Sequence, residues 1–226
     1  MIRVKILIGF LTLSFLFSAY QLYSLILHRT VPLEIKANPN YRLNSEEKFM
    51  LEDGDIILRR GEGFVSSVIS NLNEADYQIS HCAILVQKDS ANWFVVHTVS
   101  SELSNVDGVQ SERLDRFTAE SVDSTIVVLR YKADKEIRNQ IAYRARYYLD
   151  QKIPFDNAFN LADTTEFYCT ELIYKVFLDV LGYDVFAERH QTNHPDFLTF
   201  DVFLDRTKFD VILNHQGDKV TRYLKN

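Results

Sequence analysis

The pattern of apolar and polar positions opens with a long uncharged run near the N-terminus. Residues 6–27 carry no charged side chain. As a helix rising about 1.5 Å per residue, they are long enough to cross the roughly 30 Å of bilayer hydrocarbon. Because Arg3 and Lys5 precede this run, the positive-inside rule places the N-terminus in the cytoplasm and the rest of the chain outside. A cleaved signal peptide has a shorter apolar core, so the pattern favours a single-pass transmembrane anchor within residues 1–30.

After this run the chain is polar and then becomes periodic. Residues 31–46 are polar and contain two prolines, which predicts a stalk, so that residues 47–226 form the folded domain. Within that domain, apolar runs bounded by turn residues predict β-strands. A polar turn at residues 88–92 joins two of these strands into a hairpin. The strands are expected near residues 55–60, 79–87, 93–99, 125–131 and 209–213.

Apolar residues at helical spacing predict three longer helices. Residues 63–72 carry a helical stripe, and residues 134–149 place apolar side chains on one face behind an aspartate that serves as N-cap. Residues 170–181 form an amphipathic run that stops at Gly182, a frequent residue at helix C-termini. A short helix is expected at residues 195–197. Clustered antiparallel strands with helices on either side of them in the chain indicate an α+β domain.

Composition and charge narrow the class of protein. With 46% hydrophobic and 25% charged residues, the chain has the composition of a globular domain rather than of a disordered segment. Three of its 25 basic residues and none of its 31 acidic residues fall within the first 30 positions, so the remainder carries a net charge of −9. A body this acidic lacks the basic surface that binds phosphate backbones. We therefore expect no nucleic-acid partner.

The chain contains only two cysteines, Cys82 and Cys169. In a domain expected outside the cytoplasm, one interpretation is a disulfide between them. Side-chain alternation along a strand argues against it, because Cys82 directly follows His81 and must point to the opposite face. If His81 faces a cleft, Cys82 faces the core, where a free cysteine packs as a small hydrophobic residue. We therefore expect Cys82 to be buried and unbonded.

Cys169 directly precedes the amphipathic run of residues 170–181, so it is expected at a helix N-terminus. There the exposed N–H groups and the helix dipole stabilise a thiolate and lower the thiol pKa. His81 and His97 lie on the two strands of the predicted hairpin, where one imidazole can act as a base and the other can orient it. A zinc site made of the same three residues is the alternative, but they lack the close ligand pairs of zinc motifs. We expect neither metal nor cofactor.

Five segments of the chain resemble a known family. In sequence order they read LEDGDIILRR, SHCAILV, FVVHTVSS, KIPFD and EFYCTELIYKVF. They are similar to the YiiX/YebB-like group of permuted papain-like cysteine hydrolases, which is related to the NlpC-type peptidases. The resemblance covers most of residues 51–200, and its most specific part is the run from Tyr168 to Leu172. It implies a papain-like antiparallel sheet with flanking helices, Cys169 as the nucleophile, His81 as the base and a polar third residue on the next strand.

At the third position this sequence departs from the YiiX-like pattern. The group carries glutamate there, whereas His97 occupies the position here, as in the NlpC-type enzymes. Two further residues are candidates for substrate binding: Tyr168, beside the nucleophile, and Asp156, in the KIPFD segment. Packing against a helix and a role in a turn are the alternative explanations for them. Glu171 lies in the first turn of the predicted helix, where its charge favours the helix dipole without any catalytic role.

Three functions follow from these observations. The first is an extracytoplasmic cysteine amidase or peptidase, whose substrates by resemblance are cell-wall peptides or acylated amines. The second is a lipid acyltransferase or thioesterase, because lecithin–retinol-acyltransferase-like proteins share the order of two histidines before the cysteine. The third is a non-catalytic binding module tethered to the membrane. The presence of Cys169, His81 and His97 together favours an enzyme.

Overall fold

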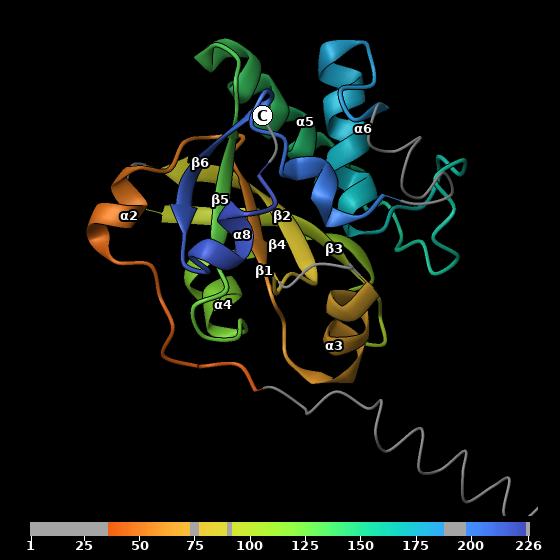
Figure 1. Ribbon diagram of the computed structural model, residues 1–226. Coiled ribbons are helices and arrows are strands. Elements are labelled where there is room, and N and C mark those ends of the chain that lie inside the picture. Colours follow the sequence, from red (N-terminus) through yellow and green to blue (C-terminus); the bar gives the residue numbers. More distant parts are fainter. Residues whose placement is uncertain (1–35, 73–76, 90–91, 188–197, 225–226) are drawn as a thin grey trace, which may run out of the picture. The chain divides into compact units, whose positions relative to one another are not determined.

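The computed structural model describes residues 36–72, 77–89, 92–187 and 198–224. In these ranges the chain forms an antiparallel sheet with helices packed on both of its faces (Figure 1), which confirms the expected α+β class. The strands are β1 (Ile56–Arg59), β2 (His81–Asp89), β3 (Asn92–Val99), β4 (Gly108–Arg113), β5 (Val127–Tyr131) and β6 (Phe209–Asn214). The helices are α2 (Ser45–Phe49), α3 (Gly63–Leu72), α4 (Leu114–Ala119), α5 (Lys135–Gln151), α6 (Cys169–Leu181) and α8 (Asp218–Thr221), with a 3-10 helix η1 at Phe200–Phe203.

The six strands lie in the order β4-β3-β2-β1-β5-β6, and each neighbouring pair is antiparallel. The predicted hairpin is confirmed as β2 and β3, with Ile84 opposite Val96. The sequence pattern did not predict β4. This strand lies at the edge of the sheet, and its residues 110–113 are all polar, so it lacks the apolar alternation by which a half-buried strand is identified. The helix expected at residues 195–197 lies outside the described residues.

Alternation of side chains gives the sheet two differently packed faces. One face packs against α5 and α6, where Leu172 of α6 shares a core with Ile84 of β2. The other face packs against α4, whose Phe117 belongs to a second core. Successive residues of β2 therefore serve different cores: Cys82 belongs to the α6 face, and His81 contacts Phe117 on the α4 face. The face on which each side chain of β2 lies therefore decides which side chains of the helices it can contact.

The boundary between the predicted stalk and the domain lies earlier than expected. The backbone N–H of Asn38 donates to the carbonyl of Ser121 at 3.0 Å. Leu43 is buried in the core on the α4 face, and Tyr41 packs against the same core. The expectation of a free stalk up to residue 46 was therefore wrong for residues 36–46. The sequence pattern did not show this, because Tyr41 and Leu43 are isolated apolar residues in a polar segment.

The predicted membrane anchor at residues 6–27 lies outside the described residues and stays a prediction. Among the residues that the structure does describe, no helix has both the length and the apolar character needed to cross a bilayer.

Gly108 holds β4 against the segment that leads to α6. Its φ of 79° is a left-handed conformation, and a Cβ at this position would overlap the carbonyl oxygen of Ile153. The same carbonyl accepts a hydrogen bond of 2.8 Å from Val109. We expect Gly108→Ala to lower the free energy of unfolding by about 3 kcal/mol, because conformational strain and overpacking add. Urea unfolding followed by the fluorescence of Trp93, the single tryptophan, measures this change.

Gly182 provides a matched control for Gly108. Its φ of 74° is nearly the same, but no atom lies within 4 Å of the position that a Cβ would take. Gly182→Ala should therefore cost only the left-handed strain, about 1 kcal/mol. Equal losses in the two variants would show that the close approach to Ile153 contributes nothing.

Candidate active site

Cys169 is the first residue of α6, as the sequence predicts. The preceding residue, Tyr168, has an extended backbone, and its N–H donates to Oε2 of Glu171 at 3.3 Å. Glu171 is fully buried, and burial raises the pKa of its carboxyl to about 7, with Lys175 opposing that effect. Glu171 thus acts as a capping residue that fixes the start of the helix. It holds Cys169 in place without contacting its thiol in any hydrogen bond of the described residues.

The two predicted substrate-binding residues belong to the fold instead. Tyr168 is buried, and its hydroxyl accepts a hydrogen bond of 2.8 Å from the N–H of Leu198. Asp156 is also buried, and its two oxygens accept from the N–H groups of Ala158 at 2.7 Å and Asn160 at 2.6 Å. Because both side chains are enclosed and bonded to the backbone, neither is presented to a substrate. The alternative roles, packing beside the helix and stabilising a turn, are the ones the structure supports.

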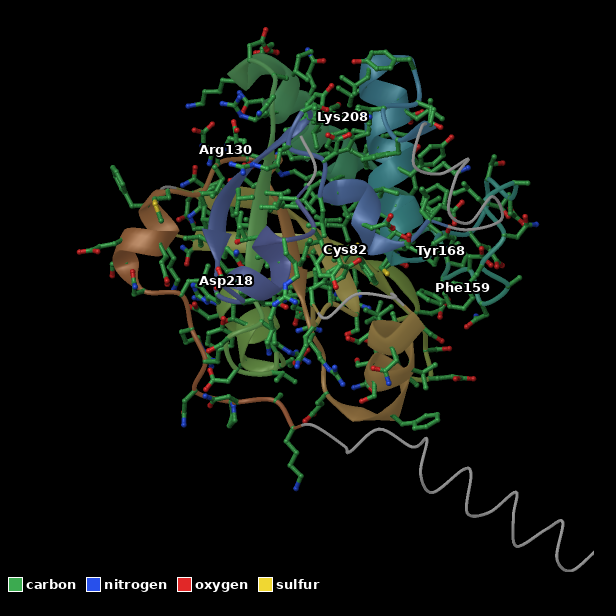
Figure 2. The ribbon with its side chains drawn as sticks, in the orientation of Figure 1. Cys82, Arg130, Phe159, Tyr168, Lys208 and Asp218 are labelled. Carbon is green, nitrogen blue, oxygen red and sulfur yellow. The ribbon has the colours of Figure 1, made fainter. Side chains whose placement is uncertain are left out.

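The two cysteines are both free, so the expectation of no disulfide is confirmed. Cys82 is completely buried in the core, also as expected. Alternation along β2 nevertheless gives only part of the geometry. Cys82, labelled in Figure 2, belongs to the core against which Cys169 packs, and its thiol hydrogen-bonds to that of Cys169. The alternation of a strand indicates which face Cys82 occupies, but it contains no information that α6 brings Cys169 to that same face.

The surroundings of Cys169 favour its thiolate. The hydrogen bond from the Cys82 thiol lowers the pKa of Cys169, burial opposes it, and the backbone N–H groups of Thr170, Cys169 and Cys82 add to the lowering. Burial raises the pKa of Cys82 well above its ordinary value, and the bond to Cys169 adds to that shift. Of the two thiols, Cys169 is therefore the one that ionises. This matches the behaviour expected of a nucleophilic cysteine at a helix N-terminus.

The predicted pairing of the two histidines is confirmed. Nε2 of His81 lies 2.8 Å from Nδ1 of His97. Both rings pack edge-on or tilted against Phe117 of α4. Burial lowers the pKa of His97 to about 3, with Arg59 and Arg116 adding to the effect; burial also lowers the pKa of His81 well below its ordinary value. Both imidazoles are therefore neutral at physiological pH, and Nδ1 of His81 is left outside the pair.

The structure does not show the predicted contact between the Cys169 thiol and an imidazole. Among the hydrogen bonds of the described residues, none joins Cys169 to His81 or His97, and the imidazoles lie on the α4 face while the thiol lies on the α6 face. The sulfur does lie beside the N–H of Cys82. That N–H belongs to the peptide bond that joins Cys82 to His81. The thiol therefore lies at the start of β2, beside the peptide unit that joins Cys82 to His81.

Two charged residues near the histidines were missed in the sequence. Glu112 of β4 places Oε1 3.5 Å from Nε2 of His97. Arg59 of β1 stacks its guanidinium 4.0 Å from the centre of the Phe117 ring. The only signal for Glu112 is a glutamate in a short polar run after a glycine, which is indistinguishable from a surface turn until β4 is known to pair with β3. Arg59 lies in the LEDGDIILRR segment, but its burial depends on the packing of α4, which the sequence pattern does not predict.

The zinc alternative for Cys169, His81 and His97 requires the three side chains to converge on one point, and the described residues show no such group. Throughout the described ranges, no three or more His, Cys, Asp and Glu side chains are arranged as ligands for a metal ion.

Comparisons with known proteins agree with this fold. A sequence model described as "Permuted papain-like amidase enzyme, YaeF/YiiX, C92 family" matches residues 50–196, which is more than half of the chain. A crystal structure described as "metalloprotein yiiX from Escherichia coli O157:H7" superposes with a TM-score of 0.56 at 21% identity. The match covers 73% of this chain and 98% of that one, and at this identity it shows the fold alone. No curated protein matches the chain. The order of histidine before cysteine, the papain-like sheet and the match to the family model together show that the chain belongs to the YaeF/YiiX (C92) family of permuted papain-like amidases.

Proposed function

We propose that this protein is a cysteine amidase in which Cys169 attacks the carbonyl carbon of an amide and His81 serves as the base. The observation that carries this proposal is the position of the Cys169 sulfur at the first residue of α6, where three backbone N–H groups face it. Such a position favours a thiolate. Membership of an amidase family supports the choice of an amide as substrate.

The proposed reaction has two halves. In the first, Nδ1 of His81 takes the proton of the Cys169 thiol, and the sulfur attacks the carbonyl carbon. Backbone N–H groups at the helix start, that of Cys169 among them, stabilise the oxyanion. The protonated His81 then gives its proton to the leaving amine, and a thioester to Cys169 remains. In the second half, His81 takes a proton from water, the resulting hydroxide attacks the thioester, and the carboxylic acid leaves as the thiolate is restored.

His97 is proposed as the residue that orients His81. Its Nδ1 bonds to Nε2 of His81 at 2.8 Å, which leaves Nδ1 of His81 as the nitrogen available for the thiol. Burial keeps both rings neutral, so that His81 has a lone pair to offer at physiological pH. The bond between the two imidazoles supplies the base and its orienting group, and the proposal requires the Cys169 sulfur to come within reach of Nδ1 of His81 during the reaction.

A substrate screen tests the proposed reaction type. The full-length chain in detergent should be assayed in three reactions that use the same acyl group. The first contains an amide, the second contains an ester, and the third contains the ester together with a primary amine as acyl acceptor. We expect hydrolysis of the amide, with an acyl group found transiently on Cys169 by peptide mass spectrometry. The acyl group should not be found on Cys82, whose thiol is buried and whose pKa burial raises.

Other results of the screen would contradict the proposal. Transfer of the acyl group to an amine or alcohol without hydrolysis of the amide would indicate an acyltransferase. No turnover and no acylation of Cys169 with any compound would indicate a binding module. Hydrolysis with the acyl group on another residue would show that Cys169 is not the nucleophile.

A further inference from the structure

Three side chains form a line across the α4 face of strands β2, β3 and β4. His81 of β2 bonds to His97 of β3 at 2.8 Å, and Nε2 of His97 lies 3.5 Å from Oε1 of Glu112 on β4. The Glu112 side chain is only 12% exposed. Its Oε1 and Nε2 of His97 are both buried, and neither has a hydrogen-bond partner among the described residues. Two buried polar atoms that face each other in this way satisfy one another when a proton lies between them.

The charges around this line come from two neighbouring elements. Arg116 of α4 places Nε 3.4 Å from Oε2 of Glu112, so the second carboxylate oxygen is held by a cation. Arg59 of β1 and Glu120, which directly follows α4, lie 3.6 Å apart beside it. Glu120 also pairs with Arg116 at 3.0 Å. Two guanidinium groups and one competing carboxylate therefore face Glu112, together with the imidazole of His97.

We infer that Glu112 is a positioning residue that sets the tautomers of His97 and His81, so that Nδ1 of His81 keeps its lone pair. A neutral imidazole carries one N–H. If the Glu112 carboxylate accepts the N–H at Nε2 of His97, then Nδ1 of His97 must accept from Nε2–H of His81. Nδ1 of His81 is then unprotonated. The inference rests on the proposed function, because only a reaction that uses His81 as a base needs this tautomer.

The ionisation of the three groups agrees with this order. Burial lowers the pKa of both histidines, so each neutral imidazole carries one N–H, at either Nδ1 or Nε2. Burial raises the pKa of Glu112 to about 7; Glu120 adds to that shift, and Arg59 and Arg116 oppose it. Above that pH the carboxylate accepts from His97. Below that pH the neutral carboxyl donates to Nε2 of His97. His97 then donates from Nδ1 to Nε2 of His81, so the single proton of His81 lies on its Nδ1.

The tautomers can be measured directly. Long-range proton–nitrogen correlation spectra of the full-length chain, labelled with ¹⁵N in histidine and kept in detergent at about pH 8, distinguish Nδ1–H from Nε2–H. In the wild type we expect Nε2–H on both His81 and His97. In Glu112→Gln the side-chain amide donates as readily as it accepts, so both rings should populate Nδ1–H. Glu112→Asp keeps the carboxylate and should retain the wild-type tautomers.

Reactivity of the thiol provides the second readout. Alkylation of Cys169 by iodoacetamide, followed by peptide mass spectrometry, should accelerate in the wild type as the pH rises through about 7. Glu112→Gln should slow it at least about tenfold at pH 7.5, an effect of the size that outer residues have on a site, and should remove the inflection. Glu120→Gln is the matched control, because Glu120 pairs with Arg59 and Arg116 but makes no hydrogen bond or ion pair with His97 among the described residues. It should only move the inflection to lower pH.

The outcomes separate this inference from the proposed function. Wild-type tautomers in Glu112→Gln, or the same loss of reactivity in Glu120→Gln, would overturn the role of Glu112. Alkylation of wild-type Cys169 no faster than that of a simple thiol would instead overturn the proposed nucleophile, and the tautomer measurement would still decide the role of Glu112. Trp93 fluorescence checks that each variant is folded. If Glu112→Gln is not folded, Glu112→Asp still tests the role of the Glu112 carboxylate.

Discussion

Replacing Cys169 by alanine should reduce amide hydrolysis by at least about a thousandfold, because removal of a nucleophile abolishes the covalent route and leaves only binding and oxyanion stabilisation. The measurement is kcat/KM with the best amide from the substrate screen. The fold should persist in this variant, since Glu171 and Leu172, rather than the thiol, hold the start of α6 through bonds to the backbone of Tyr168. An unfolding midpoint within a few degrees of the wild type checks this.

The thiol of Cys169 also has a structural neighbour, which sharpens the test. Its hydrogen bond with Cys82 is lost in the alanine variant, so a small fall in stability is expected along with the loss of activity. Cys169→Ser retains a hydrogen-bonding group there but not the acidity of a thiol, and it should be as inactive as the alanine variant. Activity of either variant within tenfold of the wild type would show that another residue carries the reaction.

Replacing His81 by glutamine should lower kcat by about a hundredfold to ten-thousandfold, the range expected for loss of a general acid–base group. KM should change little, because His81 is proposed to move a proton rather than to hold the substrate. The alkylation rate of Cys169 at neutral pH should fall in the same variant. Steady-state kinetics and alkylation by iodoacetamide measure the two effects.

His215 is a matched control for His81. It is also a partly buried histidine with two side-chain partners: its Nδ1 bonds to the hydroxyl of Tyr41, and its Nε2 lies 2.9 Å from Oε1 of Glu47. It follows β6, on the other side of β1 from β2 and β3. His215→Gln should therefore reduce stability and leave kcat unchanged.

The alternative for His81 is that Cys82 alone activates Cys169. The structure shows the contact between the two thiols but no hydrogen bond from Cys169 to His81 among the described residues. If kcat and the alkylation rate survive His81→Gln and fall in Cys82→Ala, the base is not His81. If the reverse is found, the buried thiol has a packing role and the proposed mechanism stands.

Local sequence patterns were sufficient for most of the secondary structure. The five expected strands and the three longer helices all form within a few residues of their predicted ends, because each is marked by an apolar period or a capping residue. The start of α6 at Cys169 was predicted for this reason, and so was the hairpin that pairs His81 with His97. These features depend on residues close together in the chain, and so a single sequence contains their signals.

Other features depend on which elements pack together, and only the tertiary structure decided them. β4 has no apolar period because it is an edge strand, so Glu112 could not be placed beside His97 from the sequence. Alternation on β2 correctly put Cys82 and His81 on opposite faces, but the face that α6 covers is set by the packing of two helices onto the sheet. That packing brings Cys169 to Cys82 and leaves the imidazoles under α4. The sequence alone determined which residues are candidates for the chemistry, and the tertiary structure decided which of them meet, because contacts between distant segments depend on the whole core and not on any local pattern.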